Sequence, residues 1–116
     1  MRRKYKNQPI VVNGEKFDSK KEYNRYCELK LLERDNTISN IRKQVKFVLI
    51  PAQRENGKGK VIEREVAYFA DFTYTDNATG KMVVEDVKSS ITRTNPTYTI
   101  KRKLLLYVHG IRLKEV

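Results

Sequence analysis

The spacing of apolar and polar positions predicts two helices in this chain. The first runs from Ser19 to about Asp35, with Ser19 or Asp18 as its N-cap. The second starts near Pro96, which suits a first helical turn, and ends at Gly110. Apolar residues in both recur at helical offsets, so each helix is expected to bury one stripe. The expected stripes are Tyr23, Tyr26, Cys27 and Leu31 in the first helix, and Ile100, Leu104, Tyr107 and Val108 in the second.

Four other segments have the pattern of strands. Residues 44–51 place alternate apolar side chains on one face, and residues 61–74 and 81–88 form two further strands around a turn at 76–80. Residues 111–115 alternate again after the second helix. The predicted fold class is therefore α/β, with the order αβββαβ and helices flanking one sheet. Because the last strand follows a helical crossover, we expect it to join in parallel, which makes the sheet mixed.

Composition indicates one domain with a strongly basic surface. The 116 residues include 25 Lys and Arg against 14 Asp and Glu, giving a net charge of +11. Such an excess favours a polyanionic partner, and nucleic acid is the expected one. Residues 1–13 are expected to form a flexible basic arm, and residues 52–60 a basic polar loop.

The rarity of cysteine and histidine excludes several classes of site. One Cys and one His rule out an internal disulfide and argue against a zinc site. Cys27 is expected to be a small core residue. Because no apolar run reaches about 18 residues and no signal-peptide pattern is present, we expect no membrane association. The expected location is the cytoplasm, that of a bacterial host if the protein is phage-encoded.

Three charged residues on strand-like segments are the candidate site. Burying a charged group costs several kcal/mol unless it is paired or bound to an ion, yet Asp71, Asp86 and Lys88 all adjoin apolar runs. Magnesium prefers carboxylate ligands and lowers the pKa of its bound water, so the two aspartates suit it. Lys88 lies two residues from Asp86 and shares its face, where it can orient water or hold a phosphate.

Hairpin geometry tests this assignment. If Asp76 pairs with Lys81 around the turn, Asp71 lies opposite Asp86, with Cβ atoms roughly 4.5–5.5 Å apart. Carboxylates that close repel each other, which favours a cation between them. A turn of odd length would place Glu85 on the face of Asp71 instead. A purely structural ion pair between Lys88 and Asp86 is the other alternative.

The sequence Asp71 followed by Asp86-Val87-Lys88 resembles the motif of the PD-(D/E)XK nuclease superfamily, with Ala70 in place of the proline. The order αβββαβ is that of the superfamily's restriction-endonuclease-like core. The chain is similar to small phage-encoded endonucleases and archaeal-type Holliday-junction resolvases at residues 17–22, 68–72 and 84–88. The resemblance implies that Asp71, Asp86 and the backbone carbonyl of Val87 bind Mg²⁺, or Mn²⁺ in its place, and that Lys88 is catalytic.

The resemblance also matches Glu22 to an acidic residue that completes such sites as a catalytic metal ligand. Because Ser19-x-x-Glu22 is a capping box too, both roles stay open. Gln44, where the first strand begins, is either an extra polar contact of the site or a strand-edge glutamine, and the second interpretation is the simpler one. DNA contacts are expected from a polar loop and a basic turn after the site. These residues are Ser89, Ser90, Thr92, Arg93, Lys101 and Arg102.

The expected function is that of a metal-dependent endodeoxyribonuclease that recognises DNA by shape, such as a branch or a Holliday junction, more than by base sequence. A homodimer could cut two strands of a junction. Within the same class, a general nickase or a DNA-end nuclease stays open. A basic nucleic-acid-binding protein without catalysis is the alternative from another class.

Overall fold

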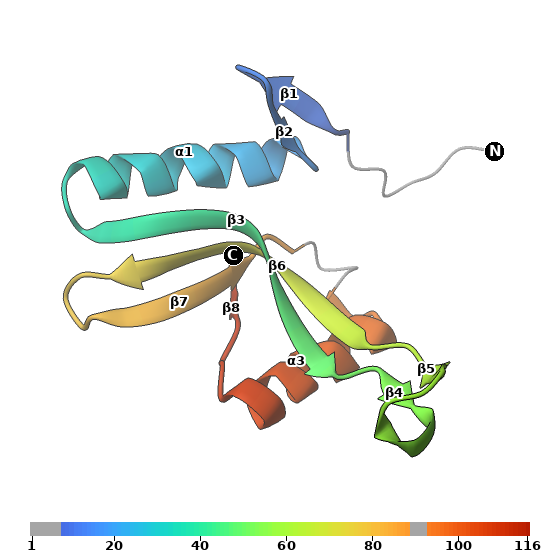
Figure 1. Ribbon diagram of the computed structural model, residues 1–116. Coiled ribbons are helices and arrows are strands. Elements are labelled where there is room, and N and C mark those ends of the chain that lie inside the picture. The colour runs from blue at the N-terminus through green and yellow to red at the C-terminus, as the bar shows by residue number, and fades with distance from the viewer. Residues whose placement is uncertain (1–7, 89–92) are drawn as a thin grey trace.

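A four-stranded mixed sheet lies between two helices in the computed structural model, which describes residues 8–88 and 93–116 (Figure 1). The strand order is β3-β6-β7-β8, with β3, β6 and β7 antiparallel and β8 parallel to β7. The predicted mixed sheet and the order αβββαβ are confirmed. The elements are α1 Lys20–Arg34, β3 Ile38–Ile50, β6 Val66–Asp76, β7 Lys81–Asp86, α3 Pro96–His109 and β8 Lys114–Glu115.

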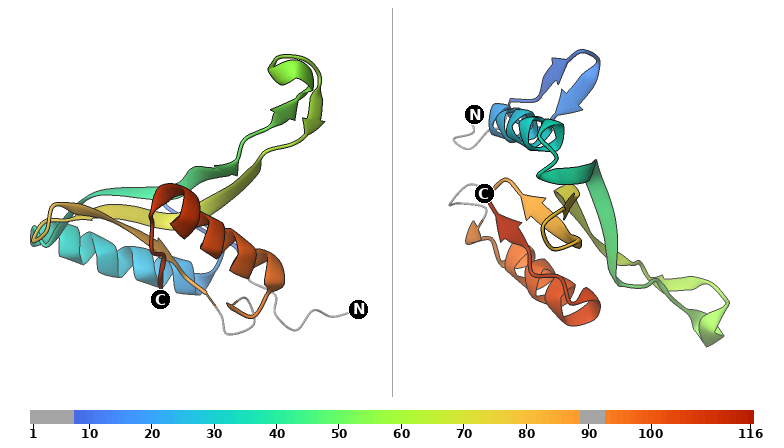
Figure 2. Two further views of the ribbon diagram at one scale, coloured as in Figure 1. Left: turned by 90° about the horizontal axis from the view of Figure 1, so that it is seen from below. Right: turned by 90° about the vertical axis from the view of Figure 1, so that its left-hand side faces the viewer.

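Two small hairpins extend this core. Strands β1 Ile10–Val12 and β2 Glu15–Phe17 pair beside the start of α1, anchored by Phe17, whose ring packs against α1. Strands β4 Gln53–Arg54 and β5 Val61–Glu63 pair around the turn η1 Glu55–Gly57 and project from the sheet (Figure 2).

The hairpins correct three expectations. The predicted arm is wrong at Ile10–Val12, which is paired strand, while residues 1–7 lie outside the described residues. The loop expected at 52–60 contains β4, and the single strand expected at 61–74 is divided into β5 and β6. Short paired segments such as β4 are difficult to predict because two residues show no periodicity.

The predicted helix ends are confirmed. The side chain of Ser19 accepts the N–H of Glu22 at the start of α1, and that of Asn95 accepts two N–H groups at the start of α3. Gly110 ends α3 with φ 69°, a conformation that glycine adopts without steric cost. Neither helix in the described part of the chain is long and apolar enough to cross a membrane.

The predicted buried stripes of the helices are wrong in part. Tyr26 and Leu104 do pack against the core, but its fully buried helix residues are Leu29 of α1 and Tyr98 and Leu105 of α3. Other residues of the expected stripes are exposed: Leu31 by 59%, Ile100 by 58% and Tyr107 by 87%. Each helix has apolar residues on two sides, and periodicity gives their spacing but not which side meets the sheet.

Alternate residues of β6 pack under α3 in the first half of the strand and under α1 in the second half. Phe72 and Tyr74 pack under α1, whereas Ala70, at the same alternation, packs under α3. The change falls at Asp71, which lies opposite Gln44 because their neighbours pair in register. Gln44 has φ 51°, and a left-handed residue breaks the alternation of a strand. Both long strands bend here (Figure 1).

Candidate active site

The candidate site lies at this bend, where α1 and α3 both begin (Figures 1 and 2). Asp76 pairs with Lys81 and Phe72 with Glu85, so the predicted register is confirmed and Asp71 lies opposite Asp86. The first turns of α1 and α3, on opposite faces of the sheet, both lie near these carboxylates, so the positive ends of two helix dipoles are close to the site.

Backbone N–H groups hold the two aspartates together. Oδ1 of Asp86 accepts the N–H of Asp71 at 2.8 Å, and Oδ2 of Asp71 accepts the N–H of Val87 at 2.8 Å. Each carboxylate thus bonds to the strand that holds the other. This reciprocal bonding fixes both side chains without neutralising either charge.

Glu22 serves the helix end and the site at once. Its Oε1 accepts the N–H of Asp18 at 2.8 Å, while its Oε2 accepts a hydrogen bond of 3.2 Å from Nε2 of Gln44. The same Nε2 lies 3.2 Å from Oδ1 of Asp71. The capping role and the site position of Glu22 are therefore compatible.

Of the two roles left open for Gln44, the polar contact with the site is the one found. Its amide joins Glu22 to Asp71, because Gln44 lies opposite Asp71 at the bend. The sequence signal was weak, since nothing in the strand pattern marks a residue of positive φ.

An acidic trio forms at the start of α1. One carboxylate oxygen from each of Asp18, Glu22 and Asp71 lies within 4.8 Å of the others. Asp18 is exposed and was considered only as a cap, so sequence reasoning missed it. Asp86 is not in this trio, although its carboxylate bonds directly to the backbone of Asp71. The predicted site residues are thus adjacent, with Glu22 and Asp71 in one group and Asp86 beside them.

Asp86 is fully buried and incompletely paired. Its Oδ2 has no hydrogen bond within the described residues, and Nζ of Lys88 lies 3.2 Å away as an ion-pair partner. That ammonium also lies 4.8 Å from the centre of the Tyr98 ring. Burial raises the pKa of Asp86, and the charge of Lys88 offsets this only in part.

Glu85 faces the opposite side of the sheet, which excludes the odd-turn alternative. Its carboxylate accepts hydrogen bonds from Arg25 at 2.9 and 2.6 Å and from the hydroxyl of Tyr74. Burial alone would raise the pKa of Glu85, but the bonds from Arg25 and Tyr74 outweigh it and lower that pKa below its ordinary value. Glu85 is therefore a satisfied structural charge.

Glu22 has a strongly shifted pKa. Burial and the adjacent carboxyl of Asp71 raise the pKa of Glu22 to about 7, although the N–H of Asp18 acts in the opposite direction. The surroundings of Glu22 therefore disfavour its ionised form. A cation bound at this position would favour that form.

The predicted DNA contacts have different outcomes. Ser89, Ser90 and Thr92 lie outside the described residues. Arg93 and Arg102 lie 3.8 and 3.9 Å from oxygens of Glu115, so both have a partner within the protein. Lys101 lines a cleft together with Lys88.

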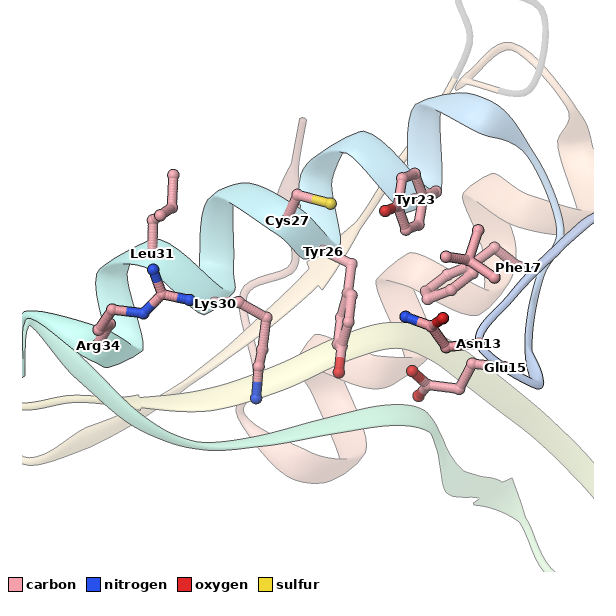
Figure 3. A pocket seen from close by; sticks show the side chains of 10 residues that line it. Asn13, Glu15, Phe17, Tyr23, Tyr26, Cys27, Lys30, Leu31 and Arg34 are labelled. Carbon is pink, nitrogen blue, oxygen red and sulfur yellow. The ribbon is translucent and has the colours of Figure 1, made fainter.

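A separate cavity of about 330 Å³ lies between the β1–β2 hairpin and α1 (Figure 3). Tyr23, Tyr26, Cys27 and Leu31 line it, so the predicted stripe borders this cavity, although Tyr26 also packs against the core. Cys27 is only partly buried, and the expectation of a core cysteine is wrong. None of the candidate catalytic residues lines the cavity.

Comparison with known proteins gives a family but no function. A family profile described as a protein of unknown function, DUF1064, matches residues 2–114, so the chain belongs to that family. Neither the comparison with curated proteins nor that with solved structures found a match.

Proposed function

We propose that this member of the DUF1064 family is a metal-dependent endodeoxyribonuclease that hydrolyses DNA phosphodiester bonds. One observation carries the proposal: Asp71 and Asp86 lie opposite each other, bonded to each other's strands, with Lys88 beside them and Glu22 nearby. The resemblance of these residues to the PD-(D/E)XK motif supports it.

The donor set fits a hard divalent cation. Asp18, Glu22 and Asp71 offer carboxylate oxygens within 4.8 Å of one another, which are the ligands that Mg²⁺ prefers. Asp86 adds an oxygen without a hydrogen bond in the described part of the chain. Mg²⁺ would be held by Asp71 and Glu22 with help from Asp86 or Asp18, and Mn²⁺ would substitute. The bound metal would draw charge from the phosphate and acidify a water molecule.

Lys88 acts on the phosphate or the attacking water. Its side chain is 18% exposed, so the ammonium lies at the border between the buried Asp86 and solvent. From there it donates hydrogen bonds to a phosphate oxygen or orients water. Asp86 and the ring of Tyr98 hold the ammonium in place, since both attract a cation.

The substrate is DNA recognised mainly through its backbone. The net charge of +11 and the two helix N-termini at the site attract phosphate without reading bases. Selectivity for a branch or a Holliday junction follows from the resemblance to resolvases, and a homodimer would supply two sites for two strands.

Cleavage assays with and without chelator test the proposal. We expect the purified chain to cut supercoiled or four-way DNA with Mg²⁺ or Mn²⁺, and to lose activity in EDTA and in Asp71→Ala. Binding in EDTA should persist in Asp71→Ala or tighten, because a carboxylate that repels phosphate is removed. Glu28→Ala is the matched control, since Glu28 is an exposed carboxylate on α1. Binding without cleavage of supercoiled, duplex, forked or four-way DNA would favour the non-catalytic alternative.

A further inference from the structure

A cleft of about 390 Å³ opens beside Lys88, on the α3 side of the candidate site. It lies where β6 extends past the bend. The pairs of β6 with β7 end at Phe72, so within the described residues no strand pairs with the outer edge of β6 at Tyr68 and Phe69. The residues that line this α3 cleft are Tyr68, Phe69, Lys88, Asn95, Thr97, Tyr98 and Lys101.

The chemistry of the α3 cleft suits an anion. Among the residues that the structure describes, two lysines line it and no carboxylate does. Lys101 forms no ion pair within the described residues, unlike Arg102 on the next position of α3. The cleft also borders the first turn of α3, where the helix dipole is positive.

A second, independent observation points to a missing polar partner. The hydroxyl of Tyr68 is buried and has no hydrogen-bond partner in residues 8–88 and 93–116, and Tyr68 is among the residues that line the α3 cleft. A buried hydroxyl without a partner costs about 1–3 kcal/mol, and a ligand oxygen that reached it would remove this cost.

An exposed aromatic ring narrows the ligand class. Phe69 is a large apolar side chain, is 54% exposed, and lines the α3 cleft together with Lys88 and Lys101. Cations beside an exposed ring form the combination that binds single nucleotides of a DNA strand, with phosphate on the cations and base or sugar on the ring. The cavity along α1 differs, because it includes Glu15 among its lining residues.

We propose that the α3 cleft binds the nucleotide next to the scissile phosphodiester, with its phosphate at Lys101 and its base or sugar on Phe69. The inference rests on the proposed nuclease function, since Lys88 links the cleft to the site. The cleaved strand then leaves the site along the start of α3, and not over α1.

Binding of labelled oligodeoxynucleotides in EDTA tests the cleft without requiring cleavage. Lys101→Gln should weaken binding about fivefold and reduce the slope of log affinity against log salt by about 1. Phe69→Ala should weaken binding about 10-fold without changing that slope, because stacking releases no counterion. The matched controls are Lys103→Gln and Tyr107→Ala, which change exposed residues of α3 outside the cleft. Each should change the affinity for DNA less than about twofold.

Cleavage kinetics then separate this inference from the proposed function. If the wild type cuts DNA, Lys101→Gln should raise KM and leave kcat unchanged. Equal losses of DNA affinity in Lys101→Gln and Lys103→Gln would contradict the proposed role of the α3 cleft. Wild-type affinity of Phe69→Ala would contradict it too. If the wild type never cuts but both cleft variants lose binding selectively, the α3 cleft binds DNA without a scissile phosphodiester beside it, and the nuclease proposal fails. Circular dichroism checks folding, and Phe69→Leu replaces Phe69→Ala if the latter does not fold.

Discussion

Glu85 and Asp86 are neighbours on β7 and both are fully buried, yet their surroundings differ completely. On the α1 side, Glu85 is bonded twice by the guanidinium of Arg25 and once by Tyr74. On the α3 side, Asp86 keeps one oxygen without a hydrogen bond in the described chain, and Lys88 is its ion-pair partner. The same burial therefore ends in opposite pKa shifts: that of Glu85 is lowered and that of Asp86 raised.

Under the proposed function, Glu85 is a structural charge and Asp86 a functional one. Burial is common to both, so burial alone identifies neither. Complete pairing stabilises the fold, whereas incomplete pairing leaves an oxygen that can accept a ligand at a cost to stability. Variants at the two positions should therefore separate activity from stability.

The largest effect is expected at Asp86. Asp86→Asn keeps the side-chain shape but removes the charge that would help to hold the metal, and cleavage should fall by about 10³-fold. The free energy of unfolding should stay the same or rise at neutral pH, because the raised pKa means that the ionised form is disfavoured in the fold. Plasmid cleavage and urea unfolding measure the two quantities. A stable variant that cuts at the wild-type rate would contradict the assignment.

The opposite result is expected at Glu85. Glu85→Gln leaves Arg25 without its buried carboxylate and should lower the free energy of unfolding by about 3 kcal/mol. Activity per folded molecule should be retained. Glu28→Gln is the control, since this exposed partner of Arg25 should cost less than about 1 kcal/mol.

The stability given by Glu85 should also depend on pH. Its folded pKa lies below the ordinary value of 4.5, so its contribution is complete above that value. The contribution is lost as the pH falls through the folded pKa. Urea unfolding should therefore show the full difference between wild type and Glu85→Gln at neutral pH, and the two proteins should converge in acid. A difference that stays constant into acid would show that Glu85 is not ionised in the fold.

This contrast between neighbours was partly predictable from the sequence. The even turn between Asp76 and Lys81 placed Asp71 opposite Asp86, and strand alternation then sent Glu85 to the other face. These are local rules, and backbone geometry enforces them. The order αβββαβ followed from local patterns as well.

The remaining features depend on packing between elements. Which side of α3 meets the sheet is decided by how Tyr98 and Leu105 fit Tyr68 and Val84, and helical periodicity has no information on that fit. Gln44 reaches Glu22 only because of its left-handed backbone at the bend. The position of Asp18 in the acidic trio likewise requires α1 to be placed against β6.

The smallest effect is expected at Glu22, a third buried carboxylate that can be compared with Glu85 and Asp86. Its pKa of about 7 lies above the ordinary value, so the folded protein binds a proton there more tightly than the unfolded chain does. Glu22 must be ionised to bind a metal. With this pKa, Glu22 is ionised in about one tenth of the molecules at pH 6 and in about nine tenths at pH 8. Mn²⁺ affinity measured by calorimetry should therefore rise about 10-fold over this range, with a proton released on binding at pH 6. In Glu22→Gln the affinity should be weaker and almost independent of pH, because the titrating ligand is gone. An equal pH dependence in both proteins would remove Glu22 from the metal site and leave it as the helix cap alone.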